Sequence, residues 1–226
     1  MEDQTKNKLY NFLLSLVTEE RKTLFDKVLD HRTRHITVML ENIYQPHNAS
    51  AVLRSCDLTG VQDIHIIEVI NKYTVSPHVA MGSAKWLNIF KYDEERDNTL
   101  KTIQHLKKQG YKIVATTPHK ESFSPEDLPL NNKVALLFGT ELTGLSDIAI
   151  ENADEFLKIP QYGFTESYNI SVSVALILFN LKNRLLNSNL NWQLNDDEKM
   201  IIKLAWARQS IRRSKLIEEE FLKKIN

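Results

Sequence analysis

The chain has 226 residues and a formal net charge of zero, with 42% hydrophobic and 26% charged residues. This length and composition suit one well-buried globular domain of about 150 residues with helical additions. A neutral total excludes a polycationic protein, so any nucleic-acid binding has to come from a local basic surface. The single cysteine, Cys56, excludes an internal disulfide and a cysteine-rich metal cluster.

Neither the first residues nor the apolar runs carry a targeting or membrane signal. The chain opens on acidic and amide residues, without the basic start and long apolar run of a secretory signal. No stretch approaches about 20 apolar residues, the length that crosses a membrane. We therefore expect a cytoplasmic protein in a reducing compartment, with Cys56 as a buried and inert thiol.

Both ends of the chain are predicted to be helical. Between residues 5 and 31, apolar side chains recur at spacings of three and four, which indicates one or two amphipathic helices. Residues 196–222 repeat this pattern, and the acidic pair Asp196 and Asp197 suits a helix start. Trp206, within the second segment, is expected to pack inside the protein rather than to stack on a base.

The middle of the chain alternates between strand-like and helix-like segments. Short runs, several of them rich in Val and Ile, predict strands at 36–40, 64–69, 112–116, 134–138 and 155–159. Helices are predicted at 48–58, 94–109, 147–153 and 167–186. This alternation predicts an α/β fold with a mostly parallel sheet covered on both faces. Ligands bind beyond the C-terminal ends of such strands, so the loops there should carry the chemistry. These loops follow Leu40, Ala115, Phe138 and Ile159.

The first of these loops leads into a helix that carries Arg54. Pro46 favours a helix start within a residue or two, and Asn48 and Ser50 can cap free backbone N–H groups there. On chemistry alone, a capping role for Asn48 and a surface position for Arg54 explain the pattern as well as a functional role does.

A second segment follows the predicted strand at 134–138 and contains two glycines and an acid. Gly139 and Gly144 let the backbone approach a ligand closely. Glu141 supplies a carboxylate between them, and Ser146 is expected to start a helix. Strand-to-helix turns often contain glycine, and the spacing does not match the dinucleotide-binding fingerprint. This segment alone therefore identifies no ligand.

A third segment, residues 159–175, joins a Pro-Gly loop to a strongly apolar helix. Ser167, at the predicted helix start, is explained by capping alone. Asn169 and Ser171 exceed what capping needs, which indicates a functional role for this helix start.

Together the three segments resemble the motifs of the SpoU family of RNA ribose 2′-O-methyltransferases. They read Pro-His-Asn-Ala-Ser-Ala-Val-Leu-Arg at 46–54, Phe-Gly-Thr-Glu-Leu-Thr-Gly-Leu at 138–145 and Ser-Tyr-Asn-Ile-Ser at 167–171. The match is closest to the TrmH branch, the tRNA guanosine 2′-O-methyltransferases, and it covers roughly residues 20–186. Finding all three motifs in this order is specific to the family.

The resemblance implies an α/β methyltransferase fold whose C-terminal stretch threads through a loop to form a deep trefoil knot. It divides the chain into an N-terminal helical extension at 1–33, a core with the knot at 34–187, and a C-terminal helical extension at 188–226. It also implies S-adenosylmethionine as cofactor, tRNA as partner and a homodimer. No metal ion, membrane partner or DNA partner is expected.

In the resemblance, the backbone of the knot grips the adenosine end of the cofactor. The implied cofactor-binding residues are Thr116, Gly139, Gly144, Ile159, Ser167 and Tyr168. Relatives often carry Leu where this chain has Tyr168. The family contact at that position is largely through backbone, so we expect cofactor binding to be preserved with a different packing on adenine.

The resemblance assigns catalysis to Arg54, supported by Asn48, Glu141 and Asn169. A ribose 2′-oxygen attacks the sulfonium methyl in line, so the protein has to position the ribose and help to remove the hydroxyl proton. An arginine side chain has a pKa of about 12 or higher, which makes it an unusual base. Two roles therefore stay open: a base assisted by the substrate phosphate, or a group that orients and stabilises the nascent oxyanion.

Two local basic clusters compensate for the neutral net charge of the chain. The first is residues 31–35, and the second, the C-terminal cluster, lies on the last predicted helix and consists of Lys199, Lys203, Arg208, Arg212, Arg213 and Lys215. The implied RNA-binding residues are Arg32, Arg34, Arg208, Arg212, Arg213 and Lys215. Positions 208, 212 and 215 fall on one face of a single predicted helix, and such faces contact phosphates without reading sequence. A solvated helix face, or a helix that contacts the partner subunit instead of RNA, remains the alternative.

The sequence thus predicts methyl transfer to the ribose 2′-hydroxyl of tRNA, at the D-loop guanosine at position eighteen. One alternative is an rRNA 2′-O-methyltransferase, but longer rRNA enzymes of the family often carry a separate N-terminal domain, and this chain offers only short helices there. The other is a non-catalytic RNA-binding protein that kept the knot. Such a protein has no need of Arg54, Asn48, Glu141 and Asn169 together.

Overall fold

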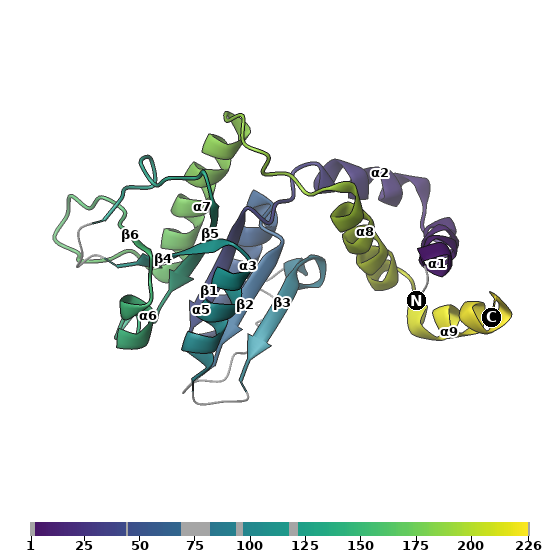
Figure 1. The fold of residues 1–226 in the computed structure, drawn as a ribbon, viewed down its shortest axis with the longest axis horizontal. Helices are drawn as coiled ribbons and strands as arrows, with labels where there is room; N and C mark the ends of the chain where they lie inside the picture. Colours follow the sequence, from purple (N-terminus) through teal and green to yellow (C-terminus); the bar gives the residue numbers. More distant parts are fainter. Residues whose placement is uncertain (1–2, 44, 69–81, 94–96, 118–121, 226) are drawn as a thin grey trace. The chain divides into compact units, whose positions relative to one another are not determined.

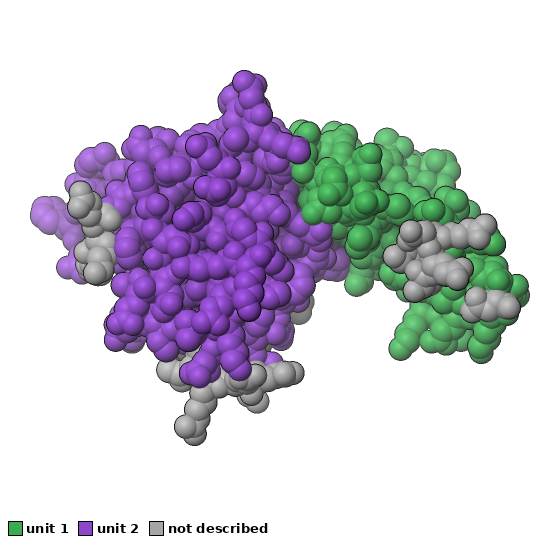
Figure 2. All heavy atoms as spheres, viewed as in Figure 1, with its two compact units in different colours: residues 1–32, 193–226 green, residues 33–192 purple. Residues whose placement is uncertain are grey.

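The computed structural model describes residues 3–225 apart from 44, 69–81, 94–96 and 118–121 (Figure 1). The chain forms two compact units, one of residues 33–192 and one that joins residues 1–32 to 193–226 (Figure 2). The sequence suggested two separate extensions. The structure unites them, because α1 (Asp3–Ser15) and α2 (Glu19–Leu29) both pack against α8 (Asp196–Ser210).

The larger unit is built on a six-stranded sheet in which all neighbouring strands are parallel. The strands are β1 (Ile36–Glu41), β2 (Asp63–Ile67), β3 (Asn88–Tyr92), β4 (Tyr111–Thr116), β5 (Lys133–Phe138) and β6 (Glu155–Leu157). Their order is β3-β2-β1-β5-β4-β6, and Leu40 at the end of β1 pairs with Phe138 at the end of β5. The loops that follow β1 and β5, which carry the first two motifs, are therefore neighbours.

Helices cover both faces of this sheet. One face packs against α3 (Pro46–Thr59) and α7 (Ile170–Leu186), and the other against α5 (Asn98–Lys108) and α6 (Asp147–Glu151). Val38 and Leu40 belong to the first core and Met39 to the second, as the alternation of side chains along a strand requires. The predicted α/β fold with a parallel sheet is confirmed, and Cys56 is buried in α3 as expected.

Several elements of the larger unit differ from those predicted. β3 was not predicted, because its sequence Asn-Ile-Phe-Lys-Tyr lies at the sheet edge and is half polar. α7 begins at Ile170 rather than at 167, and α5 begins at Asn98. Position 69 of the second predicted strand and positions 94–96 of a predicted helix lie outside the described residues.

The helical unit has its own small core. Leu9, Leu13, Phe25 and Trp206 are buried, and the ring of Phe25 lies 5.5 Å from that of Trp206, so the predicted packing of Trp206 is confirmed. The single helix predicted at 196–222 is wrong: α8 ends at Ser210, and α9 (Ser214–Ile225) begins after a turn that contains a left-handed residue at 213. None of the described helices combines the length and apolarity that crossing a membrane demands.

Candidate active site

A buried carboxylate ends β1. Glu41 is 2% exposed and accepts hydrogen bonds from the Thr99 hydroxyl (2.5 Å) and from the backbone N–H (2.8 Å) and hydroxyl (2.7 Å) of Ser146. Ser146 in turn caps α6, as predicted, since its hydroxyl accepts the N–H of Ala149. Glu41 therefore ties the second motif to the end of β1. It was not among the predicted site residues, although a charged residue that ends an apolar central strand signals a buried polar contact.

The second motif folds back on itself. Thr140 and Gly144 exchange backbone hydrogen bonds of 3.0 and 3.1 Å, which closes a tight turn. A Cβ on Gly139 would lie 2.2 Å from the carbonyl oxygen of Gly144, so no larger residue fits there. Gly144 itself has a φ of 68°, in the left-handed region that glycine adopts without steric cost.

Three of the four predicted catalytic residues meet in one hydrogen-bonded chain. The side-chain oxygen of Asn169 accepts the backbone N–H of Ser171 at 2.9 Å. The Asn169 amide nitrogen donates to Glu141 Oε1 at 2.5 Å and to Asn48 Oδ1 at 3.2 Å. Asn48, which is buried, donates to Gln45 Oε1 at 3.1 Å. We call this chain, from Ser171 through Asn169 and Asn48 to Gln45 with Glu141 at its side, the amide relay.

The amide relay corrects two capping predictions. Asn48 does not cap α3, because Gln45 holds the N-cap position and makes no side-chain capping bond. Asn169, rather than Ser167, caps α7. Asn169 was expected to be surplus to capping, and it instead combines the cap with the contacts to Glu141 and Asn48.

Two cavities flank the turn at 140–145. The first, of about 570 Å³, lies among the loops that follow β4, β5 and β6. The second, of about 880 Å³, is lined by the loop after β1 together with the same turn. Both volumes fall in the range of small-molecule sites. Glu141, Asp147 and Ile170 line both cavities, and Asn48 lines the second.

All the predicted cofactor-binding residues lie around the first cavity. They are Thr116, Gly139, Gly144, Ile159, Ser167 and Tyr168. The cavity also has an apolar wall that includes Phe138 and Ile177, and acidic groups at Glu141, Asp147 and Glu166, with Lys158 as a cation. Such a lining suits a ligand with one flat apolar end and a positively charged end.

Arg54 lies apart from the amide relay. It is exposed on α3, lines neither cavity and makes no hydrogen bond or ion pair with the described part of the chain. Its neighbours Leu53 and Cys56 point into the core, whereas Leu58, one turn further along, is 77% exposed. A single subunit therefore brings together Asn48, Glu141 and Asn169 but not Arg54.

Comparison with known proteins identifies the family of this chain. Residues 35–179 match the model of the SpoU rRNA Methylase family. The chain belongs to this family. A tRNA (guanosine(18)-2′-O)-methyltransferase of Borreliella burgdorferi is 44% identical over 91% of this chain and 93% of its own length.

Solved structures of SpoU proteins share the fold. The TrmH/SpoU tRNA modifying enzyme of Aquifex aeolicus superposes with a TM-score of 0.77 at 29% identity, over 86% of this chain and 98% of its own. An rRNA methyltransferase of Sinorhizobium meliloti, solved with AdoMet bound, has a TM-score of 0.58 at 24% identity, over 72% of this chain and 60% of its own. The parallel sheet described above is thus the SpoU fold.

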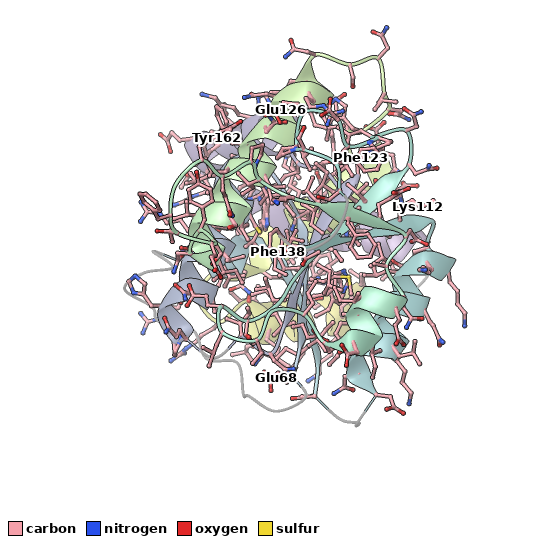
Figure 3. All side chains as sticks on the ribbon, turned by 90° about the vertical axis from the view of Figure 1, so that its left-hand side faces the viewer. Glu68, Lys112, Phe123, Glu126, Phe138 and Tyr162 are labelled. Carbon is pink, nitrogen blue, oxygen red and sulfur yellow. The ribbon has the colours of Figure 1, made fainter. Side chains whose placement is uncertain are left out.

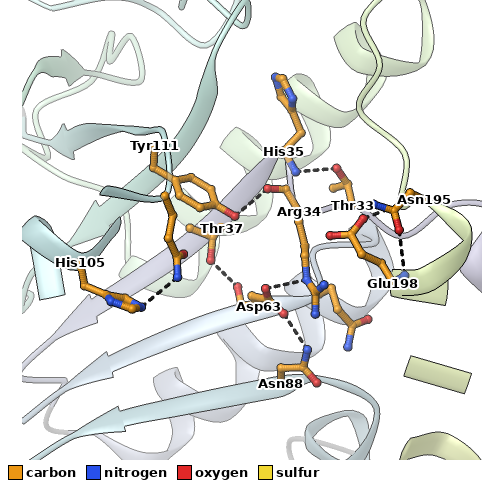
Figure 4. A network of polar contacts seen from close by, with 12 residues as sticks. Thr33, Arg34, His35, Thr37, Asp63, Asn88, His105, Tyr111, Asn195 and Glu198 are labelled. Atoms are coloured by element: carbon orange, nitrogen blue, oxygen red, sulfur yellow. Dashed lines mark hydrogen bonds and ion pairs between the residues drawn. The ribbon is translucent and has the colours of Figure 1, made fainter. Parts of the chain in front are cut away.

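Two of the arginines predicted to bind RNA are engaged within the protein. Arg32 is 1% exposed, and its guanidinium lies 5.3 Å from the centre of the Trp206 ring. The Nε of Arg34 donates to Asp63 at 2.9 Å, and Asn88 donates to the same carboxylate (Figure 4). The expectation that these two side chains offer a free basic surface is wrong in this structure, because both have partners that the local sequence does not show.

The C-terminal cluster is divided between paired and exposed cations. Arg208 forms a two-pronged ion pair with Glu218 of α9, through contacts of 2.7 and 2.6 Å. Because the helix breaks after Ser210, the predicted common face of positions 208, 212 and 215 is not formed. Arg212, Arg213 and Lys215 are exposed at the break and have no ion-pair partner among the described residues. These three remain candidates for contact with phosphates.

Proposed function

We propose that this protein transfers a methyl group from S-adenosylmethionine to the ribose 2′-hydroxyl of the guanosine at position eighteen of tRNA. The observation that carries this proposal is the amide relay, in which Asn48, Glu141 and Asn169 meet between two cavities. Membership of the SpoU family supports the reaction type. The relatives named for this tRNA position support the substrate, since one of them matches nearly the whole chain.

The first cavity fits the cofactor. S-adenosylmethionine supplies an activated methyl group on a positively charged sulfur. Glu141, Asp147 and Glu166 give this cavity an excess of negative charge over Lys158, which favours a ligand with a net positive charge. The closed turn at 139–144 leaves backbone rather than side chains against the ligand, which accounts for the two glycines. Tyr168, which is 44% exposed, offers a ring at the rim of this cavity.

The knot is part of the proposal. The loop after β4 holds the end of β6 on one side, since the backbone of Phe123 bonds to Phe156 and Lys158. The same loop is held by α7, because Arg184 donates to the carbonyls of Pro125 and Leu128, at 2.6 and 2.8 Å. Figure 3 labels Phe123 and Glu126 in this loop. Contacts of one loop with segments before and after residues 159–169 support a threaded chain.

A homodimer completes the site in this proposal. Val172, Leu176 and Phe179 of α7 are 43%, 44% and 65% exposed and recur at the spacing of one helix face. α7 packs against α3, where Leu58 is also exposed and Arg54 lies one turn before it. A second copy that covers these apolar residues would place Arg54 beside the partner's cavities. Since Arg54 lines no cavity of its own subunit, its catalytic role requires that placement.

The proposed dimer is tested by measuring the molecular mass of the protein in solution. Phe179→Glu puts a charge into the apolar face and should convert a dimer into monomers in sedimentation-velocity runs, because an unpaired charge in an interface is costly. Gln104→Glu, exposed on α5, which covers the opposite face of the sheet, serves as a control for added charge. A wild-type protein that sediments as a monomer would remove this part of the proposal.

One assay tests the reaction. Purified protein and labelled S-adenosylmethionine are incubated with unmodified tRNA or with rRNA fragments, and the methylated nucleotide is mapped. Label in the ribose of guanosine eighteen of tRNA is the expected result. Label confined to rRNA would show that rRNA, and not tRNA, is the substrate. Cofactor binding without any methyl transfer would show that the protein is a non-catalytic RNA-binding protein. We retain the cytoplasm as the predicted compartment.

A further inference from the structure

The second cavity has a lining that differs from that of the first. It contains three acidic residues, Glu41, Glu141 and Asp147, and no Lys or Arg among the described residues that line it. A phosphate is repelled by such a lining. The amides of Gln45 and Asn48 and the apolar side chains of Ile43 and Ile170 suit a flat, neutral and polar ring. A nucleobase has these properties.

The amide relay determines which group Gln45 offers to this cavity. A backbone N–H can only donate, so the Asn169 atom that accepts from Ser171 has to be the oxygen, and its NH₂ group faces the other way. That NH₂ meets the carboxylate of Glu141, which only accepts when ionised, so two independent partners agree on the orientation. The Asn48 atom that Asn169 contacts is therefore an oxygen as well.

The same logic continues to the end of the relay. With its oxygen turned to Asn169, Asn48 directs its NH₂ to Gln45, whose oxygen accepts at 3.1 Å. The Gln45 NH₂ group is then the free end of the relay: it belongs to an exposed residue that lines the second cavity, and no described residue accepts from it. A glutamine amide normally offers a donor and an acceptor. Here the oxygen is held toward Asn48, so the NH₂ group is the end of the amide that is left for a ligand.

An amide that offers its NH₂ end discriminates between the two purines. The O6 and N7 edge of guanine presents two acceptors, whereas the same edge of adenine presents an acceptor and an amino donor. A free glutamine amide matches adenine with both of its ends. A glutamine whose oxygen is held by Asn48 matches guanine and places its NH₂ against the amino group of adenine.

We propose that the second cavity holds the base of the methylated nucleotide, and that Gln45 selects guanine by donating to its O6 and N7 edge. The inference rests on the proposed function for the identity of the substrate. Gln45 thus acts as a specificity-determining residue that Asn48 and Asn169 orient. The amide relay links the group that reads the base to Glu141, which lines both cavities.

The test exchanges the donor for an acceptor without breaking the relay. In Gln45→Glu, a carboxylate oxygen still accepts from Asn48, but the second oxygen replaces the NH₂ group. Transcripts of tRNA are prepared with guanine, hypoxanthine, adenine or 2-aminopurine at the target position, and single-turnover methylation rates are measured. The wild type should accept guanine and hypoxanthine, which keep O6 and N7, and should be roughly tenfold slower with the other two bases, as the loss of one hydrogen bond implies. The variant should lose this preference.

A binding measurement keeps the inference separate from the reaction. Saturation-transfer NMR with free guanosine, inosine and adenosine, in the absence of cofactor, should show stronger transfer to guanosine and inosine for the wild type, and no such preference for Gln45→Glu. Gln104→Glu, exposed on α5 away from both cavities, adds the same charge and should behave as the wild type.

The outcomes are distinct. A preference for guanosine in binding, with no methylation of any RNA, would remove the proposed function and leave the base site standing. Methylation of tRNA with equal rates for all four bases, or a preference that survives in Gln45→Glu, would overturn the inference. A wild type that binds none of the nucleosides and methylates all four bases equally would overturn it as well.

Discussion

Polar side chains are held in two different ways in the two units of this protein. In the larger unit, Asn169 donates to Asn48, Glu41 and Asn169 accept from backbone N–H groups, and Glu41 and Asn48 are almost fully buried. In the helical unit, surface pairs such as Lys199–Asp30 and Lys203–Asp26 join the helices. Buried networks give strict orientation and are costly to break, whereas surface ion pairs contribute little each. Substitutions in the loops should therefore affect chemistry and stability, and substitutions in the helical unit should mainly affect affinity for RNA.

The largest expected effect comes from Arg54. Arg54→Ala should lower the single-turnover methylation rate at least about a hundredfold, as is typical when a group that stabilises developing charge is removed. Arg54→Lys should also be poor, because an ammonium does not reproduce the planar guanidinium. Since the side chain is exposed and has no described partner, the free energy of unfolding should stay within about 0.5 kcal/mol of the wild type.

The control for Arg54 is Lys108→Ala, an exposed cation on α5 that lines neither cavity. Its rate should match that of the wild type. Full activity of Arg54→Ala would remove Arg54 from the mechanism and would leave the amide relay as the whole of the catalytic apparatus.

The next largest effect is expected at Glu41. Glu41→Leu leaves the backbone N–H of Ser146 and two hydroxyls without their acceptor in a buried place, and should lower the free energy of unfolding by about 3 kcal/mol. Glu41→Gln should cost only about 1 kcal/mol, because hydroxyls can turn to accept from its NH₂ while its oxygen keeps the N–H of Ser146. Urea denaturation gives both values.

The turn at 140–145 lines both cavities. Loss of the Glu41 contacts that hold this turn should therefore also weaken cofactor binding. Titration calorimetry with S-adenosylmethionine measures this weakening. Glu151→Leu, exposed on the same short helix α6, is the matched control and should change neither quantity by much. Equal losses in the two variants would show that Glu41 has no special role in holding the turn.

The sequence was enough to predict that the motif residues lie close together, because the order of the strands alone places them at one edge of the sheet. Adjacent parallel strands end at the same edge, so Asn48 after β1 and Glu141 after β5 are brought together by strand order alone. Orientation within the site was not predictable. Whether Gln45 shows a donor or an acceptor depends on Ser171, which lies more than a hundred residues away in sequence.

The basic surface was predicted less well for the same physical reason. A basic side chain is available to RNA only if it is not already in an ion pair with an acidic residue. Arg34 pairs with Asp63, and Arg208 pairs with Glu218. Neither pairing shows in a local charge pattern. The edge strand β3 was missed because a half-exposed strand has no strong apolar signal, and the break after Ser210 was missed because no glycine or proline marks it.

A moderate effect on RNA binding is expected from the three exposed cations of the helical unit. The triple variant of Arg212, Arg213 and Lys215 to Ala should weaken tRNA binding about tenfold at low salt and reduce the slope of log affinity against log salt by about 2 to 3. Fluorescence titrations at several salt concentrations give both numbers. The exposed pair Lys223 and Lys224, changed together to Ala, is a control at the end of α9. An unchanged salt slope in the triple variant would place the RNA contact elsewhere.

The smallest effect is expected at Arg208, and it sharpens the distinction between paired and exposed cations. Both prongs of its guanidinium are engaged by Glu218, so Arg208→Ala should reduce the stability of the helical unit by about 1 kcal/mol or less, as measured by urea denaturation. In Arg208→Ala alone, the carboxylate of Glu218 loses its partner and its negative charge lowers the local positive potential. The double change Arg208→Ala with Glu218→Ala removes one positive and one negative charge, so the local net charge stays that of the wild type. The double variant should therefore bind tRNA as the wild type does, with the same salt slope. If it instead lost affinity as the triple variant does, Arg208 would contact phosphate directly, and its pairing with Glu218 would have to open when RNA binds.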